Sequence, residues 1–335
     1  MKATADVPRL TLGLPVYNGE RFLAQALDAL LAQTFTDFEL IISDNSSTDR
    51  TGEIGRRYEA SDRRVRYVHH PENRGAAFNH NFVIEQACSE FFKWVSDDDL
   101  YAPDLLERCI EALDSRPEIA LAHAWTAFID DDGRVINAND YPLSTDVADP
   151  VERFRSLLYT QGGDDIYGII RMSVLRKVAL HGSYHLADRT FVAELALHGP
   201  FHNVPEFLYF RRDHVTRASR IGRNVRKRCT NLDPRRGDRW RHPLVRLFGE
   251  YLLGYVTAIR RAPISSADRW RCIQILAVWV ARHANPLHRR QLLQSPDPAF
   301  KAIGSASLAA RLIEKLPIGR QRAATVGHRG ESKTT

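Results

Sequence analysis

The chain has 335 residues, of which 44% are hydrophobic and 26% charged, a balance typical of a globular protein with a sizeable core and not of a disordered chain. Its four cysteines lie far apart without a CxxC pair, which argues against a zinc site or a disulfide framework and fits a reducing compartment. The net charge of +6 is concentrated between Arg211 and Arg241, a stretch that indicates an anionic partner but carries no recognised nucleic-acid-binding motif.

The N-terminus lacks the apolar segment of a secretory signal. The longest apolar run, over 273–281, is far shorter than the ~20 residues of a membrane-spanning helix. We therefore expect a cytoplasmic protein that does not cross a membrane, with peripheral contact at the inner face of the plasma membrane as an open alternative.

Strand-like apolar segments alternate with helical segments through the first hundred residues. The expected strands and helices, in chain order, are 9–16, 19–33 (helix), 38–43, 49–58 (helix), 65–70, 76–87 (helix) and 91–96. This alternation predicts an α/β fold with a mostly parallel sheet covered on both faces. Because ligands bind such sheets outside the carboxyl ends of the strands, we expect the chemistry in four loops, at 15–20, 43–49, 70–75 and 96–99.

After residue 99 the pattern becomes mixed. The expected elements are a helix at 103–114, a strand at 119–130 with a hairpin turn, a helix at 151–159, a strand at 166–171, a short helix at 173–180, a helix at 187–199 and a strand at 203–212. Beyond residue 213 the chain is basic and helical, with expected helices at 244–260 and 266–283. We expect a catalytic domain over 1–215, a helical region over 216–315 and a disordered tail over 316–335.

Three adjacent carboxylates follow a strand that reads as buried, in FFKWVSDDDLYAP at 91–103. Such a cluster at a strand end can hold a hard divalent cation, whose remaining ligands are substrate phosphates. The alternative is a polar loop in which Asp99 or Asp104 caps the next helix. A phosphoaspartyl hydrolase is disfavoured because no hydroxyl residue follows, and an isoprenoid synthase because its DDxxD motif lies on a helix.

LPVYNGE, SDNSSTDRT, HPENRGAAFNHN and WVSDDDLYAP occur in this order, each at the expected end of a strand. Together they resemble the motifs of family 2 glycosyltransferases, which have the GT-A fold, over about residues 8–215. The resemblance implies that Pro15 and Tyr17 lie beside the donor base with Glu20 nearby. It implies that Asp44 accepts a hydrogen bond from the base edge, the alternative being a residue that only stabilises a turn. It also implies that Arg74 lies near the diphosphate, the alternative being a solvated charge on the loop.

The same resemblance makes Asp98 the main ligand of Mg²⁺ or Mn²⁺, with Asp99 beside it and Asp97 on the donor nucleotide. The family often has an aspartate where this chain has Ser96. HLADRTFVAELALHG, at 185–199, resembles the stretch that carries the catalytic base, which places Asp188 in that role. The usual preceding glutamate is Ala187 here, and a helix N-cap is the alternative for Asp188.

Arg212 and His214, at the end of the last strand, are candidates for contact with the diphosphate or the acceptor. The resemblance implies an inverting hexosyltransferase that takes a nucleoside-diphosphate sugar. We expect it to be non-processive, because no QxxRW motif follows and no membrane span is expected. UDP is favoured because Asp44 suits the imide N–H of uracil, with thymidine and guanosine left open. The expected acceptor is an unidentified hydroxyl, lipid-linked or part of a cell-envelope glycan. The alternative is an inactive nucleotide-sugar-binding or scaffolding protein, with Ser96 and Ala187 as signs of decay.

The arginines at 217, 220, 223 and 226 recur every third residue, and the helices that follow have apolar stripes. One hypothesis is that this region holds the protein on an anionic membrane surface. The alternative is that these helices only pack against the catalytic domain.

Overall fold

The computed structural model describes residues 7–160, 164–214 and 225–284. A nine-stranded sheet has the order β3-β2-β1-β4-β8-β6-β9-β5, with β7 paired to β6. The strands are β1 Leu10–Val16, β2 Phe38–Asp44, β3 Val65–His69, β4 Phe91–Trp94, β5 Leu100–Tyr101, β6 Leu121–Ile129, β7 Val135–Asn139, β8 Ile169–Arg171 and β9 Phe201–Arg212. The helices are α1 Leu23–Leu31, α2 Thr51–Ser61, α3 Ala76–Gln86, α4 Leu105–Ser115, α5 Pro150–Tyr159, α6 Met172–Leu175, α7 Ala187–His198, α8 Val225–Leu232, α9 Leu244–Arg261 and α10 Ser266–Ala284, with short 3-10 helices at Asp164–Tyr167 and Pro234–Gly237.

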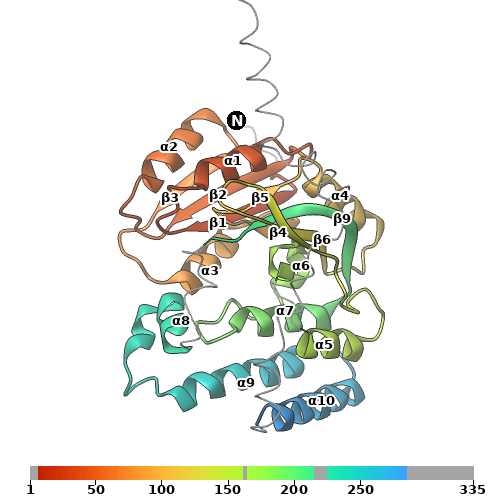
Figure 1. Ribbon diagram of the computed structural model, residues 1–335. Coiled ribbons are helices and arrows are strands. Elements are labelled where there is room, and N and C mark those ends of the chain that lie inside the picture. The colour runs from red at the N-terminus through yellow and green to blue at the C-terminus, as the bar shows by residue number, and fades with distance from the viewer. Residues whose placement is uncertain (1–6, 161–163, 215–224, 285–335) are drawn as a thin grey trace, which may run out of the picture.

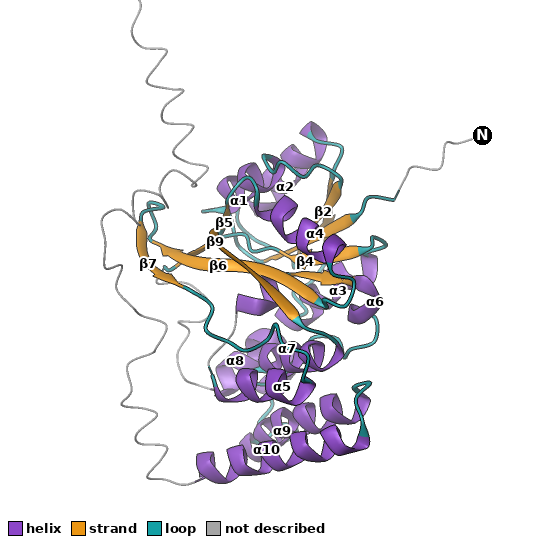
Figure 2. Cartoon of the chain, turned by 90° about the vertical axis from the view of Figure 1, so that its right-hand side faces the viewer, coloured by secondary structure: helices purple, strands orange, loops and turns teal. Residues whose placement is uncertain are grey.

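Helices cover both faces of the sheet. In Figures 1 and 2, α1, α2 and α4 lie over one face, and α3, α6 and α7 lie under the other, while α9 and α10 form an outer layer beyond α7. Leu10, Leu12 and Leu14 share one face of the central strand β1 and are completely buried because helices cover that face. The predicted α/β class and the alternation of the first half are confirmed.

The parallel half of the sheet gathers the four expected loops at one edge. β1 runs parallel to β2 and β4, and β2 runs parallel to β3. The carboxyl ends of all four strands therefore point the same way, which is the arrangement that positions a ligand site.

The second half of the sheet carries β9 back to this edge. β9 runs parallel to β6 and pairs antiparallel with β5, with Leu100 opposite Phe210 and Tyr101 opposite Tyr209. The two-residue strand β5 was not predicted, since two residues carry no readable pattern. Its pairing brings the end of β9 beside the aspartates that precede β5.

The last helices share an apolar core with helices of the preceding part of the chain. Tyr251 and Tyr255 of α9 pack with Phe154 of α5 and Leu197 of α7 in one apolar cluster. The predicted division at residue 215 remains a prediction, and the arginines at 217, 220 and 223 and the tail at 316–335 lie outside the described residues. Among the helices that the structure describes, none is long and apolar enough to cross a membrane.

Lys93 is the polar exception in the buried strand β4. Its side chain is 2% exposed, and its Nζ donates a hydrogen bond to the Tyr167 carbonyl between the rings of Tyr101 and Tyr209. Burial lowers the pKa of Lys93 to about 8. The unfolded chain, with an ordinary lysine pKa of about 10.4, therefore binds more protons than the native state between these two values.

We expect Lys93→Met to reveal this titration. The stability of the wild type should rise relative to the variant by about 1 kcal/mol between pH 7 and pH 9, because only the wild type gains from losing the buried proton. Urea unfolding of both proteins at the two pH values measures the difference. Exposed Lys177, replaced by Met in the same way, is the control and should give a pH-independent offset; a pH-independent offset for Lys93→Met would contradict the account.

Candidate active site

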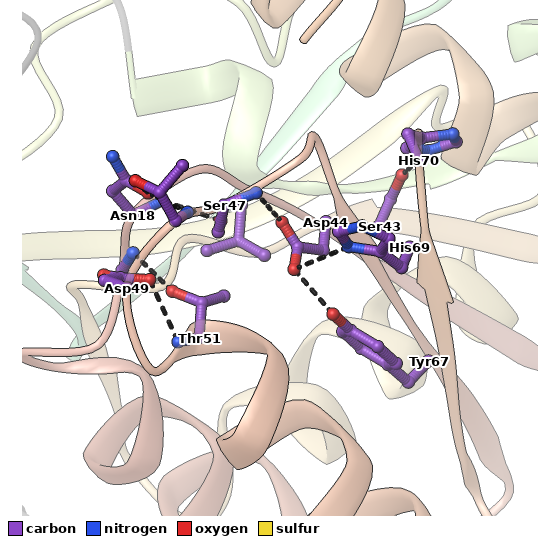
Figure 3. Close-up of polar contacts among 12 residues, drawn as sticks. Asn18, Ser43, Asp44, Ser47, Asp49, Thr51, Tyr67, His69 and His70 are labelled. Atoms are coloured by element: carbon purple, nitrogen blue, oxygen red, sulfur yellow. Dashed lines mark hydrogen bonds and ion pairs between the residues drawn. The ribbon is translucent and has the colours of Figure 1, made fainter. Parts of the chain in front are cut away.

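Reciprocal hydrogen bonds tie the first two loops together. The Asn18 backbone N–H donates to Ser47 Oγ at 2.9 Å, and the Thr48 N–H donates to Asn18 Oδ1 at 2.9 Å. Asn18 and Ser46 hold left-handed backbone conformations, with φ of 54° and 65°. Asparagine and serine adopt tight turns of this kind because their short polar side chains bond nearby backbone. Figure 3 shows Asn18 and Ser47 side by side above the start of α2.

Asp44, the last residue of β2, is the anchor of this loop pair (Figure 3). One carboxylate oxygen accepts the Ser47 N–H at 2.8 Å, and the other accepts the Tyr67 hydroxyl at 2.6 Å and faces His69 Nδ1 at 3.4 Å. Burial would raise the pKa of Asp44, but these hydrogen bonds outweigh burial and lower it, so the carboxylate is ionised.

The Asp44 side chain is 0% exposed. It therefore has the turn-stabilising role that the sequence offered as an alternative, and its contact with a donor base remains a prediction. Tyr67 and His69, which hold it, were not identified from the sequence because nothing in β3 marks the face on which they lie.

The remaining residues predicted for the base lie around the first loop. Pro15 pairs with Ser43 in the sheet, and Tyr17 is 50% exposed, an aromatic ring open to a ligand. Glu20 accepts the Arg50 N–H at 3.0 Å and so supports the start of α2. Tyr17 is the member of this group whose exposure suits stacking.

Asp97 and Asp98 lie at the end of β4 and face two different neighbours. A Cβ atom on Gly19 would clash with the Asp97 carboxylate, so Asp97 lies directly over the first loop. Asp98 accepts a hydrogen bond from Ser96 Oγ, and its other oxygen lies 2.9 Å from His214 Nε2. Ser96, the departure from the family pattern, therefore orients the carboxylate that follows it.

Asp99 and Arg212 point into the protein. Asp99 is 0% exposed and accepts hydrogen bonds from the Tyr209 hydroxyl and, at 2.8 Å, from the Arg212 N–H. The fully buried Arg212 guanidinium donates to the carbonyls of Asp98, Asp130 and Asp131 at 2.8–2.9 Å. Both residues thus hold the Asp98 loop in place, and the predicted contacts of Asp99 with a cation and of Arg212 with the diphosphate or acceptor remain predictions.

The side chains at this edge suit a divalent cation whose remaining ligands come from the substrate. Across the described part of the chain, no group of three or more His, Cys, Asp or Glu side chains has the geometry to hold a metal ion alone. Mg²⁺ usually takes one or two protein carboxylates and fills its shell with phosphate oxygens and water. Asp98, with His214 against it and Asp97 adjacent, matches such a partial set.

Asp188 lies in the first turn of α7. The helix begins at Ala187 and its N-cap is Leu186, with no side-chain cap, so the alternative of Asp188 as the N-cap is wrong. Within the described residues the Asp188 carboxylate accepts no hydrogen bond. Burial lowers the pKa of His181, and the nearby negative charge of Asp188 opposes this. Asp188 is only partly buried, so a ligand can reach its carboxylate.

A cavity of about 610 Å³ separates α3 from the segment that follows α8. Arg74 lines it with its guanidinium 3.7 Å from the centre of the Phe78 ring. His181 lines it as well, 9% exposed and with a buried Nδ1 that has no hydrogen-bond partner among the described residues. Asn81 holds His181 in place through paired bonds to its backbone at 2.8 and 2.9 Å. His181 was missed from the sequence because a lone histidine carries no motif.

Gly75 follows Arg74 at the edge of this cavity and packs against Leu232 at the end of α8. Its φ of 91° and ψ of 163° lie in a region that essentially only glycine occupies, and a Cβ atom there would clash with the Leu232 carbonyl oxygen. Gly75→Ala should therefore lower the free energy of unfolding by about 1–3 kcal/mol. The matched control is Gly249→Ala in α9, where a Cβ atom meets open space. This change should raise the free energy of unfolding by about 1 kcal/mol, because alanine favours a helix over glycine. Urea unfolding measures both; the same sign for the two variants would refute the strain at Gly75.

The sequence model described as glycosyl transferase family 2 matches residues 11–178, half of the chain. The chain belongs to glycosyltransferase family 2. The predicted family is confirmed, and the matched segment of this glycosyltransferase contains the four loops at the ends of β1 to β4. His181, Asp188 and the end of β9 lie beyond it.

Relatives of this glycosyltransferase agree with the assignment. An uncharacterised glycosyltransferase of Rickettsia typhi is 34% identical over 113 residues, which is 34% of each chain. Glycosyltransferase GlyG of Streptococcus pneumoniae is 25% identical over 194 residues, 56% of this chain and 64% of GlyG. The matches thus span less than two thirds of either relative.

The S. aureus TarS fragment 1–349, solved in complex with UDP-GlcNAc, superposes with a TM-score of 0.62 at 17% identity. The superposition covers 92% of this chain and 79% of the TarS chain. This likeness shows the GT-A fold, as predicted.

Proposed function

We propose that this chain transfers a sugar, with inversion, from a nucleoside-diphosphate sugar to an acceptor hydroxyl. The observation that carries the proposal is the placement of Asp98, oriented by Ser96 and paired with His214, at the strand edge where Asp97 meets the first loop. TarS has been solved with UDP and with UDP-GlcNAc, and we propose a UDP-sugar as the favoured donor here.

The nucleotide would lie across the ends of β1, β2 and β3. The half-exposed Tyr17 ring provides a stacking surface for the base. Asp44, ionised and locked by Tyr67 and Ser47, fixes the loop against which the base rests. A direct bond from Asp44 to the uracil imide would require this buried carboxylate to become accessible on binding.

Asp98 and His214 would hold a divalent cation, Mg²⁺ or Mn²⁺, with Asp97 adjacent. When bound, such a cation stabilises the negative charge that develops on the departing diphosphate. Arg74 lies on the wall of the 610 Å³ cavity, where its guanidinium can contact the same diphosphate. Arg212 and Asp99 act indirectly, by keeping the Asp98 loop in position.

Asp188 would act as the general base. The acceptor oxygen attacks the anomeric carbon as the bond from that carbon to the diphosphate breaks, and the hydroxyl proton passes to the Asp188 carboxylate. The product is inverted because attack and departure occur on opposite faces of the sugar. The nucleoside diphosphate leaves with the electron pair of the bond that breaks.

The alternative, an inactive nucleotide-sugar-binding or scaffolding protein, rests on Ser96 and Ala187. The Ser96 hydroxyl donates a hydrogen bond to Asp98 and so supports the site. Ala187 is a buried residue at the start of α7. Neither substitution removes a residue that the proposed reaction uses.

Release of nucleoside diphosphate from a panel of UDP-, dTDP- and GDP-sugars with Mn²⁺ separates the two functions. We expect slow hydrolysis of one donor with water as acceptor, and the freed sugar should initially have the inverted anomeric configuration by NMR. A retained configuration would contradict the proposed mechanism, and tight donor binding without any turnover would favour the inactive protein.

A further inference from the structure

Five large apolar side chains, one in the turn before α9 and four along the helix, are exposed to solvent. The exposed fractions are 95% for Trp240, 49% for Leu244, 85% for Val245, 46% for Phe248 and 61% for Leu253, and these five residues are here called the Trp240 patch. A surface helix normally presents polar residues on the face opposite its core. α9 instead buries Leu247, Tyr251, Tyr255 and Ile259 and still exposes apolar residues on its outer face.

The turn before α9 is built to hold Trp240 outward. Asp238 accepts the N–H groups of Trp240 and Arg241 at 2.9 and 3.1 Å, which fixes the backbone on both sides of the indole. The ring itself extends into solvent. A fixed backbone with an exposed Trp lowers the entropy that the side chain must lose when a partner covers it.

Arginines surround the patch. Residues 234–262 contain seven arginines and two acidic residues, a net of five positive charges. Arg235 and Arg241 are 88% and 84% exposed at their side chains. Both acidic residues are engaged, Asp238 in the turn and Glu250 by Arg236 and Arg246. Arg235 also pairs with Asp233, and Arg241 pairs with Asp238, so the arginines that border the patch are ion-paired but still outnumber the acidic residues.

The apolar surface continues inward from Leu253. This residue and Leu180, which is 46% exposed, line a cavity of about 240 Å³ that reaches Phe191 of α7. Of the five patch residues, Leu253 is the one that lines this cavity. Figures 1 and 2 place α9 in the outermost layer, on the side away from α1 and α2.

We propose that the Trp240 patch seats this enzyme on a membrane that carries anionic lipid. Tryptophan prefers the boundary between headgroups and acyl chains, the apolar residues of α9 would enter that boundary, and arginines near a negative surface each contribute about 1 kcal/mol. The charge around the patch favours this occupant over a second copy of the chain, whose own arginines would repel it. The inference concerns binding alone, so it stands or fails independently of the proposed reaction.

Sedimentation of the full chain with vesicles tests the proposal. We expect binding to vesicles of 70% phosphatidylcholine and 30% phosphatidylglycerol, weak binding to phosphatidylcholine alone, and loss of binding in 0.5 M NaCl. Replacing Trp240 and Val245 by Ser together should weaken binding at least about tenfold, since both apolar side chains would be buried in the membrane boundary. Ile136→Ser, which removes an apolar residue that is 46% exposed on β7, is the matched control and should bind as the wild type does.

Three results would overturn the proposal. The full chain could fail to bind the anionic vesicles, which would mean that the patch does not seat the protein on such a membrane. The double variant could bind as tightly as the wild type, which would assign binding to other basic residues. The wild type could be a dimer by light scattering that the double variant converts to a monomer, which would make the patch a contact between copies.

Discussion

Asp188→Asn should bind the donor almost as the wild type does and transfer sugar about 10²–10⁴-fold more slowly, the range that a positioned general base contributes. The amide keeps the size of the side chain but accepts no proton. Because Asp188 accepts no hydrogen bond from the described residues, the change should leave the fold intact. The steady-state rate of donor hydrolysis with water as acceptor, beside equilibrium binding of the donor, measures the two effects separately.

The conservative variant Asp188→Glu is the control for a purely structural role. It restores a carboxylate and should recover part of the rate that Asn loses, whereas a structural defect would leave both variants equally slow. Glu194, on the same helix but buried and bonded to the Ala179 N–H at 3.2 Å, provides a comparison residue whose replacement should act on stability instead. Equal losses of donor affinity and rate in Asp188→Asn would contradict its assignment as the base.

Asp98→Ala should have the opposite signature, because it removes the carboxylate proposed to hold the cation. We expect the metal-dependent part of donor affinity to disappear, a loss of about 100-fold or ~2.7 kcal/mol, while binding without metal stays as in the wild type. Calorimetric titration of UDP with and without Mn²⁺ measures both parts.

Asp98→Asn separates charge from packing at the same position. Its amide oxygen can still accept the Ser96 hydroxyl hydrogen bond, so the loop should keep its shape. A cation prefers the charged carboxylate, so this variant should nevertheless lose most of the metal-dependent affinity. Metal-dependent binding that persists in both variants would move the cation site away from Asp98.

The alternation of strands and helices in the first half could be predicted from the sequence because each buried strand needs apolar residues on both faces. Leu12 and Leu14, Ile41 and Ile42, and Phe91 and Phe92 are all buried, as that pattern requires. The same periodicity placed the four loops at one edge. Local pattern therefore identified where the site lies.

The orientations within the site could not be predicted, since they depend on pairings across long stretches of chain. Asp99 turns inward because Tyr209 and Arg212, more than a hundred residues later, pair against it through β5 and β9. Three adjacent aspartates look equivalent in the sequence and differ only once β9 is in place.

Tertiary packing likewise decides which face of α9 is exposed. Both of its faces are rich in apolar residues, and contact with α5 and α7 selects the Tyr251 face for the core. The exposure of Val245 follows from that choice, whereas Trp240 lies in the turn before the helix. The sequence alone indicated an amphipathic basic region without showing which apolar residues remain outside.

Thermal unfolding of the full chain with UDP, dTDP and GDP, each with and without Mn²⁺ or Mg²⁺, tests the central claim most directly. The account predicts a rise in Tm with one nucleotide, UDP above the others, that requires the metal and is absent in Asp98→Ala. No rise with any nucleotide, from a sample that unfolds cooperatively, would mean that these aspartates do not serve a nucleoside-diphosphate sugar.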